Sequence, residues 1–135
     1  MKRLSGLRLL EEQEGEGREA QQGDHVIYNS RMFLNKGEEV RIQEEQIRSL
    51  PKDVIRVVDG TTLIDHKTRL GSRQMIAGVE HALLGMKVGG YRRVRISPHL
   101  AYRDKGVPGF IPADAVLVVE VWLRTIVGGG KVTLP

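Results

Sequence analysis

The chain contains 135 residues, of which 40% are hydrophobic and 28% are charged, the size and composition of one folded domain. It has no cysteine, so disulfides, thiolate metal sites and cysteine nucleophiles are excluded. The formal net charge of +4 is too small by itself to indicate nucleic-acid binding.

No segment approaches the roughly 18 consecutive apolar residues of a membrane-spanning helix. Residues 1–6 also lack the apolar stretch of a signal peptide. We therefore expect a cytoplasmic protein that does not enter a membrane.

The first part of the chain changes between strand-like and polar segments. Residues 5–14 predict a strand with polar interruptions, and residues 25–34 predict a longer strand rich in β-branched and aromatic side chains. Residues 38–50 are mostly polar with scattered apolar side chains, which favours a short amphipathic helix that ends before Pro51.

The middle of the chain predicts a hairpin and then the main helix. Residues 53–64 form two β-rich runs around the pair Asp59 and Gly60, whose residue types suit the positive φ angles of a tight turn. Residues 76–86 carry apolar side chains at helical spacing, and this helix is expected to end near Gly85.

The last part of the chain predicts two strands separated by a long loop. Residues 91–96 alternate between apolar and arginine side chains, and residues 97–114 are rich in proline and glycine. Residues 115–127 form the strongest strand, in which Trp122 is out of phase with the apolar face and is expected on the outer side of a sheet. Many strands and one short helix predict an α+β fold, with the helix packed on a largely antiparallel sheet.

The second half of the chain also carries short motifs in a specific order. They are Leu70-Gly71, Ile76–Glu80, Met86–Gly90, Arg95–Pro98, Leu100–Tyr102, Gly106–Pro112 and Ala115. Weaker motifs near the start are Ser5–Leu7, Glu14–Gly17 and Gly23–Val26. Together they resemble FKBP-type peptidyl-prolyl cis-trans isomerases, loosely over residues 5–34 and well over residues 70–124. The motifs near the start are similar to those of bacterial members.

The resemblance implies an FKBP-like fold for residues 1–135 as a single domain. This fold is a curved antiparallel sheet of about five strands wrapped on one short α-helix. Residues 41–65 do not match the family pattern, so an extra inserted segment of roughly a hairpin's length is expected there.

The resemblance also implies catalysed rotation about Xaa–Pro bonds of peptides or unfolded protein segments. The barrier is about 18–20 kcal/mol because rotation breaks amide resonance, and a site need only bind the twisted amide better than the planar forms. By resemblance, the Tyr102 hydroxyl and the Ile76 backbone N–H donate to substrate carbonyls, and Met75, Phe110 and Ile111 form apolar walls. The four histidines lack metal-site spacing, and neither a metal nor a cofactor is expected.

The other positions that the resemblance assigns to the site depart from the family pattern. They are Val79, Val119, Val40, Asn29, Arg41 and Val107. The first three replace aromatic side chains, Asn29 replaces a tyrosine, Arg41 replaces an aspartate, and the last is at a variable loop position. Because aromatic rings fix pocket walls, these departures predict a divergent member of the family with a degraded pocket and weak activity.

Two other functions remain open for this sequence. A non-catalytic FKBP-like binding module or chaperone would use residues 41–65 as its contact surface. A nucleic-acid or ribosome-associated module would use the basic residues between positions 87 and 105, but Arg92 is out of phase with Arg93 and Arg95 on their strand. Nucleic acid is therefore the weaker hypothesis, and we expect a monomer that binds proline-containing peptides.

Overall fold

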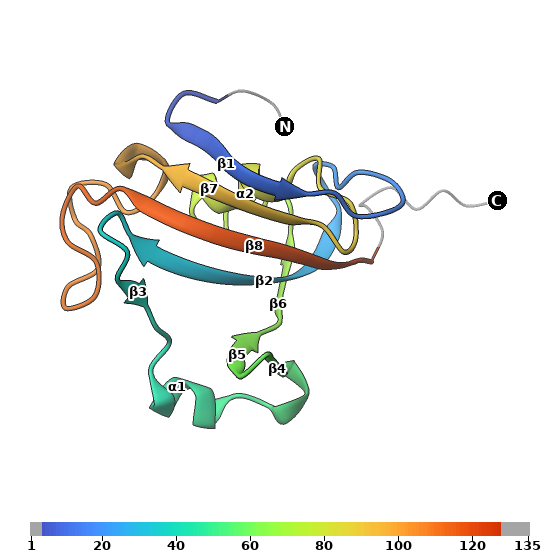
Figure 1. Ribbon diagram of the computed structural model, residues 1–135, viewed down its shortest axis with the longest axis horizontal. Coiled ribbons are helices and arrows are strands. Elements are labelled where there is room, and N and C mark those ends of the chain that lie inside the picture. Colours follow the sequence, from blue (N-terminus) through green and yellow to red (C-terminus); the bar gives the residue numbers. More distant parts are fainter. Residues whose placement is uncertain (1–3, 128–135) are drawn as a thin grey trace.

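A curved antiparallel sheet wraps around helix α2 (Ala77–Leu83), as Figure 1 shows for the computed structural model of residues 4–127. Within these residues the sheet has six strands, and every pairing between them is antiparallel. In order across the sheet they are β1 (Leu7–Gln13), β7 (Tyr91–Ile96), β8 (Leu117–Ile126), β2 (His25–Leu34) and β3 (Glu39–Val40), with β6 (His66–Arg69) paired to the first residues of β2. This architecture confirms the predicted α+β fold.

The core lies between the sheet and helix α2. Alternate side chains of β8 point into it, because successive residues of a strand face opposite sides of the sheet. Full burial of an aliphatic side chain contributes about 1.5–3 kcal/mol, so these rows supply much of the stability of the sheet. The fully buried side chains of β7 and β8 are Val94, Ile96, Leu117, Val119, Val121 and Leu123.

Helix α2 approaches the sheet closely at one glycine. A Cβ atom added to Gly78 would be 2.5 Å from Cγ2 of the fully buried Ile96 on β7. Any larger residue would push the helix away from the sheet. Gly78 therefore sets the depth of the helix, and with it the position of Ile76 at the start of the helix.

The other end of helix α2 is held by an arginine from the sheet. The buried Arg92 of β7 donates through Nη1 to the carbonyl oxygens of Ala82 (3.0 Å) and Leu84 (2.8 Å), and through Nε to Glu12 Oε2 (2.6 Å). The last carbonyl groups of a helix have no partner within the helix. Arg92 supplies a donor for two of these carbonyl groups. Its side chain lies on the face of β7 opposite to the exposed Arg93 and Arg95, as the strand alternation predicted.

Residues 41–65 form a lobe below the sheet in Figure 1. The lobe contains the predicted helix and the predicted hairpin, whose turn residues Asp59 and Gly60 have φ angles of 51° and 77°. No helix among the described residues is long and apolar enough to cross a membrane. The elements of the lobe are α1 (Glu44–Ser49), a short 3₁₀ helix (Lys52–Val54), β4 (Ile55–Val58) and β5 (Thr61–Ile64).

Candidate functional site

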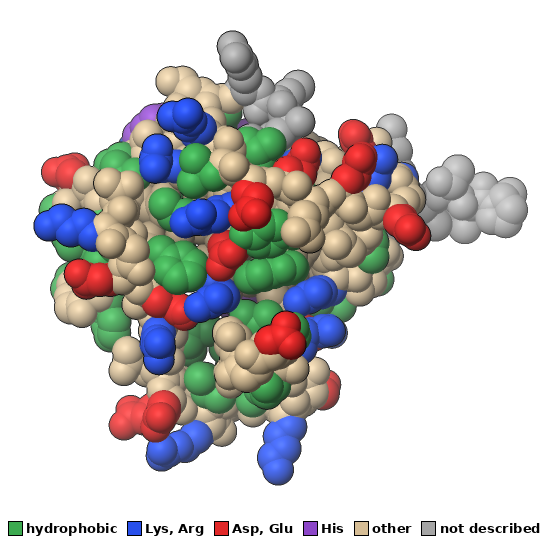
Figure 2. Space-filling view, viewed as in Figure 1, with side chains coloured by type: hydrophobic (Ala, Val, Ile, Leu, Met, Phe, Trp, Pro, Cys, Tyr) green, Lys and Arg blue, Asp and Glu red, His purple; other side chains and the backbone are tan. Residues whose placement is uncertain are grey.

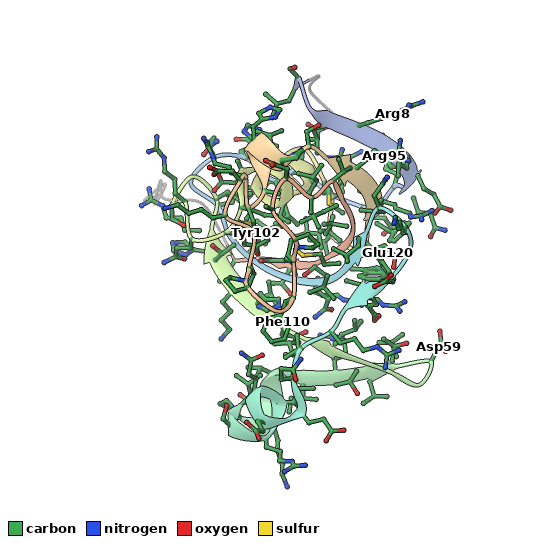
Figure 3. All side chains as sticks on the ribbon, turned by 90° about the vertical axis from the view of Figure 1, so that its left-hand side faces the viewer. Arg8, Asp59, Arg95, Tyr102, Phe110 and Glu120 are labelled. Atoms are coloured by element: carbon green, nitrogen blue, oxygen red, sulfur yellow. The ribbon has the colours of Figure 1, made fainter. Side chains whose placement is uncertain are left out.

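The sequence-predicted site residues gather where helix α2 begins, beside the long loop between β7 and β8. Figure 3 looks onto this end of the molecule, with Tyr102 further inside the loop and Phe110 at its tip above the lobe. Met75, Ile76 and Tyr102 are half-buried and pack against the hydrophobic core. Because these side chains are only partly buried, their exposed parts form a surface that solvent can reach.

Backbone hydrogen bonds fix the shape of this loop. Val107 and Ile111 exchange two N–H to carbonyl bonds of 2.8 Å, and the Gly106 N–H donates to the Tyr102 carbonyl at 3.0 Å. Gly106 has a φ of +58°, and an added Cβ would lie 2.3 Å from the Ile111 carbonyl oxygen. The loop therefore buries Ile111 in the core and leaves Phe110 48% exposed.

Two residues of this surface carry hydrogen-bond donors. The Tyr102 hydroxyl is half-buried, and burial raises the pKa of its phenol, so the group stays protonated at neutral pH. Ile76 is the residue before α2, and its carbonyl accepts the N–H groups of Val79 and Glu80. Its own N–H makes no backbone bond within residues 4–127, as expected for the orphan donors of a helix start.

Tyr28 contributes an aromatic ring that the sequence did not predict for the site. It is buried on the core face of β2, opposite Leu123. Burial and the neighbouring Tyr102 together raise the pKa of Tyr28 to about 12. The ring of His66 on β6 lies 5.2 Å from the ring of Tyr28, measured between centroids. Tyr28 shares its strand face with the fully buried Val26, and this phase is the sequence signal that would have found it.

Most of the predicted residues belong to one apolar cluster, and three do not. Phe110 and Arg41 are exposed, and Asn29 is buried on the other side of the sheet, in register with Trp122. The residues that the structure joins in the core or packs directly against it are Tyr102, Ile76, Met75, Val79, Ile111, Val119, Val40 and Val107.

Asn29 connects the sheet to the lobe. Its Nδ2 donates to the Ile64 carbonyl and to Asp65 Oδ1, both at 2.7 Å, and its Oδ1 accepts from Arg124 Nε at 2.5 Å. Arg124 is the extra residue of a bulge in β8, since Leu123 and Thr125 pair with consecutive residues of β2. The structure therefore does not bring Asn29 to the group around Tyr102. Its side chain instead bonds to the end of the lobe and to Arg124 of β8.

The expectation of a site depleted of aromatic side chains is not supported. Tyr28 lies next to Tyr102. The sequence analysis had placed Asn29, the next residue along the chain, at this tyrosine position of the site. His66 extends this row of rings on β6. Trp122 faces the outer side of the sheet, as predicted, and its ring lies 5.3 Å from that of Tyr91.

The fold and this site define the class of FKBP-type domains, in which a curved sheet, one short helix and the loop before the last strand enclose an apolar surface. A family model described as FKBP-type peptidyl-prolyl cis-trans isomerase matches residues 16–124. The chain belongs to this family, and its function is peptidyl-prolyl cis-trans isomerisation.

Several curated proteins are similar to this chain. FK506-binding protein 1A of Neurospora crassa is 34% identical over 129 residues, which cover 95% of this chain and 94% of that protein. FK506-binding protein 4 of Chaetomium thermophilum is 32% identical over 126 residues, 93% of this chain but 22% of that protein. Peptidyl-prolyl cis-trans isomerase FKBP11 of Bos taurus is 44% identical over 77 residues, 53% of this chain and 38% of that protein. These relatives are fungal and mammalian, so the expected bacterial origin is not supported.

Proposed function

We propose that this chain isomerises Xaa–Pro bonds of polypeptides at the surface formed by Tyr102, Tyr28, Ile76 and Met75. The observation that carries this assignment is the half-buried, protonated Tyr102 hydroxyl beside the buried ring of Tyr28. An apolar surface that includes the Tyr102 hydroxyl as a donor suits a proline ring flanked by carbonyl groups. The buried Val79, Ile111 and Val119 lie in the same cluster and support this surface from below.

The proposed chemistry needs no covalent step. The planar amide is stabilised by resonance and is more polar than the twisted amide. Transfer from water to an apolar site therefore costs the twisted amide less, so the site favours the twisted form. The Tyr102 hydroxyl donates a hydrogen bond to one substrate carbonyl, and the Ile76 N–H donates a hydrogen bond to another. These two hydrogen bonds hold the chain on both sides of the proline while the bond between them rotates.

We further infer that the lobe of residues 41–65 is an insertion within one domain. The buried bonds of Asn29 to Ile64 and Asp65 support this, because they join the end of the lobe directly to β2. A monomer and a cytoplasmic location stay predictions.

A second candidate function is the binding of unfolded protein segments without catalysis. Apolar side chains that are exposed in the lobe and the loop favour it: Ile42 (39%), Val57 (66%), Val58 (40%) and Phe110 (48%). Such side chains give an apolar segment a place to bind beyond the site itself.

The charge distribution on the outer face of the sheet disfavours the nucleic-acid hypothesis. Figure 2 shows this face, where basic and acidic side chains interleave with hydrophobic ones. Arg31 pairs there with Glu39 at 2.9 Å and lies 3.8 Å from Glu120. A nucleic-acid surface would instead gather unpaired basic groups along one face.

The test of the catalytic proposal is NMR exchange spectroscopy on proline peptides with the wild-type protein and Tyr102→Phe. Loss of the hydroxyl should lower kcat/KM by about fivefold to thirtyfold, equivalent to one hydrogen bond of about 1–2 kcal/mol. Tyr91→Phe is the matched control, because it removes a phenol from the opposite face of the sheet. Equal activity of Tyr102→Phe and wild type would reject Tyr102 as a substrate donor. Suppressed aggregation of an unfolded protein, without enhanced exchange, would favour the binding function.

A further inference from the structure

Two arginines lie directly opposite each other on the outer face of the sheet. Arg8 of β1 pairs in register with Arg95 of β7, and both side chains are exposed. Figure 3 labels this arginine pair at one side of the view, with Tyr102 nearer its centre. Directly opposed residues of antiparallel strands have Cβ atoms about 4.5–5.5 Å apart, and like charges at that spacing repel each other. The arginine pair therefore costs stability unless an anion compensates its charge.

The acidic side chains of the neighbouring row do not compensate the arginine pair. Among residues 4–127, no carboxylate forms an ion pair with Arg8 or Arg95. Glu11 and Glu120 lie in the next row of the register on the same face. The hydroxyl of Tyr91, one row further, lies 2.5 Å from Glu120 Oε2 and 3.4 Å from Glu11 Oε2. Both carboxylates are therefore turned toward Tyr91 and away from the arginine pair.

The row of the arginine pair itself also supplies no free carboxylate among the described residues. Across the sheet, Arg95 is opposite Val118, Val118 is opposite Phe33, and Phe33 is opposite Glu39. Val118 is apolar and only 6% exposed. The carboxylate of Glu39, at the far end of the row, is bound by Arg31 at 2.9 Å. The positive charge of the arginine pair is therefore presented to solvent.

We propose that the arginine pair is a docking point for an acidic polypeptide segment, which places an Asp or Glu carboxylate between the two guanidinium groups. A guanidinium has donors arranged to match the two oxygens of a carboxylate, and Arg8 and Arg95 present two such groups on adjacent strands. A bound carboxylate also removes the repulsion within the pair, so the free protein is prepared for an anionic partner. The docking point lies on the outer face and is separate from the proposed isomerase site.

The small extent of the positive charge favours a carboxylate segment over a nucleic acid. A nucleic acid gains its affinity from several phosphate contacts along a basic stripe. Here the neighbouring row alternates in sign across the sheet, in the order Glu11, Arg93, Glu120 and Arg31. A continuous phosphate backbone would meet the acidic members of that row, whereas one carboxylate needs the arginine pair alone.

The experiment is an NMR titration of the protein with a short peptide of alternating glutamate and glycine. The peptide contains no proline, so its binding does not depend on the proposed isomerase site. The amide signals of Arg8 and Arg95 should shift, and Kd should rise as salt is added. Arg8→Gln/Arg95→Gln should raise Kd at least about threefold. Unshifted amide signals at the arginine pair would overturn the proposal.

The matched control is Lys67→Gln/Arg69→Gln, which removes two exposed cations from one face of β6. Both double variants lower the net charge equally, so they differ only in where the charge is lost. The control should bind the peptide within about 1.5-fold of wild type. An equal rise of Kd in the two double variants would show a general attraction by net charge and would overturn the docking point.

Two further measurements test the class of partner and the repulsion within the pair. An RNA oligonucleotide of the same charge should bind wild type more weakly than the peptide, and tighter binding of the RNA would reject an acidic polypeptide as the partner. Arg95→Gln should unfold at the same urea concentration as wild type or at a higher one, because it removes the repulsion. A lower midpoint would mean that Arg95 already has a stabilising partner within the protein, which contradicts the proposal. Loss of isomerase activity in Tyr102→Phe, or its absence in wild type, bears on the site of Tyr102 and leaves these outcomes unchanged.

Discussion

The guanidinium of Arg92 on β7 lies 2.8 Å from the carbonyl oxygen of Leu84, and so joins the sheet to the end of helix α2. Arg92→Met keeps the buried chain length but removes every donor. The carbonyls of Ala82 and Leu84 then lose their partner inside the protein, so we expect the free energy of unfolding to fall by about 2–4 kcal/mol.

Urea unfolding checks this expectation. Arg93→Met is the matched control, because Arg93 is the exposed neighbour on the same strand and its loss should cost less than about 0.5 kcal/mol. Equal destabilisation by the two substitutions would mean that the bonds to α2 contribute nothing beyond strand packing.

The conformation of Gly106 should control activity through the shape of the site loop. An alanine there requires a positive φ and places its Cβ against the Ile111 carbonyl oxygen, so the loop must move. A displacement of about 1 Å in a positioned group costs on the order of 10² in rate, and we expect kcat/KM to fall at least about tenfold.

Gly109→Ala separates the effect of backbone strain from the effect of the collision with the Ile111 carbonyl. Gly109 also has a positive φ, +81°, but no atom lies within 4 Å of an added Cβ. Both substitutions strain the backbone by about 1–2 kcal/mol, and only Gly106→Ala adds the collision. Exchange spectroscopy that finds the same loss of kcat/KM in both variants would show that strain alone, rather than loop position, limits activity.

The ion pair of Asp65 and Arg56 should make the attachment of the lobe sensitive to acid. The hydrogen bonds from Arg56 lower the pKa of Asp65 from 3.8, burial opposes this effect, and the bond from Asn29 adds to the lowering. A lowered folded-state pKa contributes stability above the unfolded value, and this contribution is lost as the pH falls through the folded value. Asp65→Asn should therefore be less stable than wild type at pH 7 by about 1–3 kcal/mol.

The difference between wild type and Asp65→Asn should shrink toward zero below the folded pKa of Asp65. Urea unfolding at pH 7 and at about pH 2 measures it. Asp59→Asn, at the exposed turn of the same hairpin, is the control and should differ little from wild type at either pH. A difference for Asp65→Asn that is the same at both values would exclude the carboxylate charge as its source.

Local pattern was enough to locate most of the elements of this protein. The strand at 25–34, the strand at 91–96 and the hairpin around Asp59 and Gly60 lie where the sequence predicts them. Alternation and turn chemistry act between neighbours in the chain, so they can be read without the fold. The order of motifs after residue 70 likewise identified the family, which the comparisons confirm.

The partners of each strand were decided only by the tertiary structure. β2 carries apolar side chains on both faces, with Val26 and Tyr28 on one and Ile27 and Phe33 on the other, so alternation could not say which face is the core. The bulge at Arg124 and the lobe bury the face of Asn29 as well. β6 is a strand because its backbone pairs with β2, although its own residues are mostly polar. Sequence thus determined the local elements and the family. Long-range pairing placed Tyr28 beside Tyr102 and turned Asn29 to the other side of the sheet, because only that pairing decides which strand face is buried.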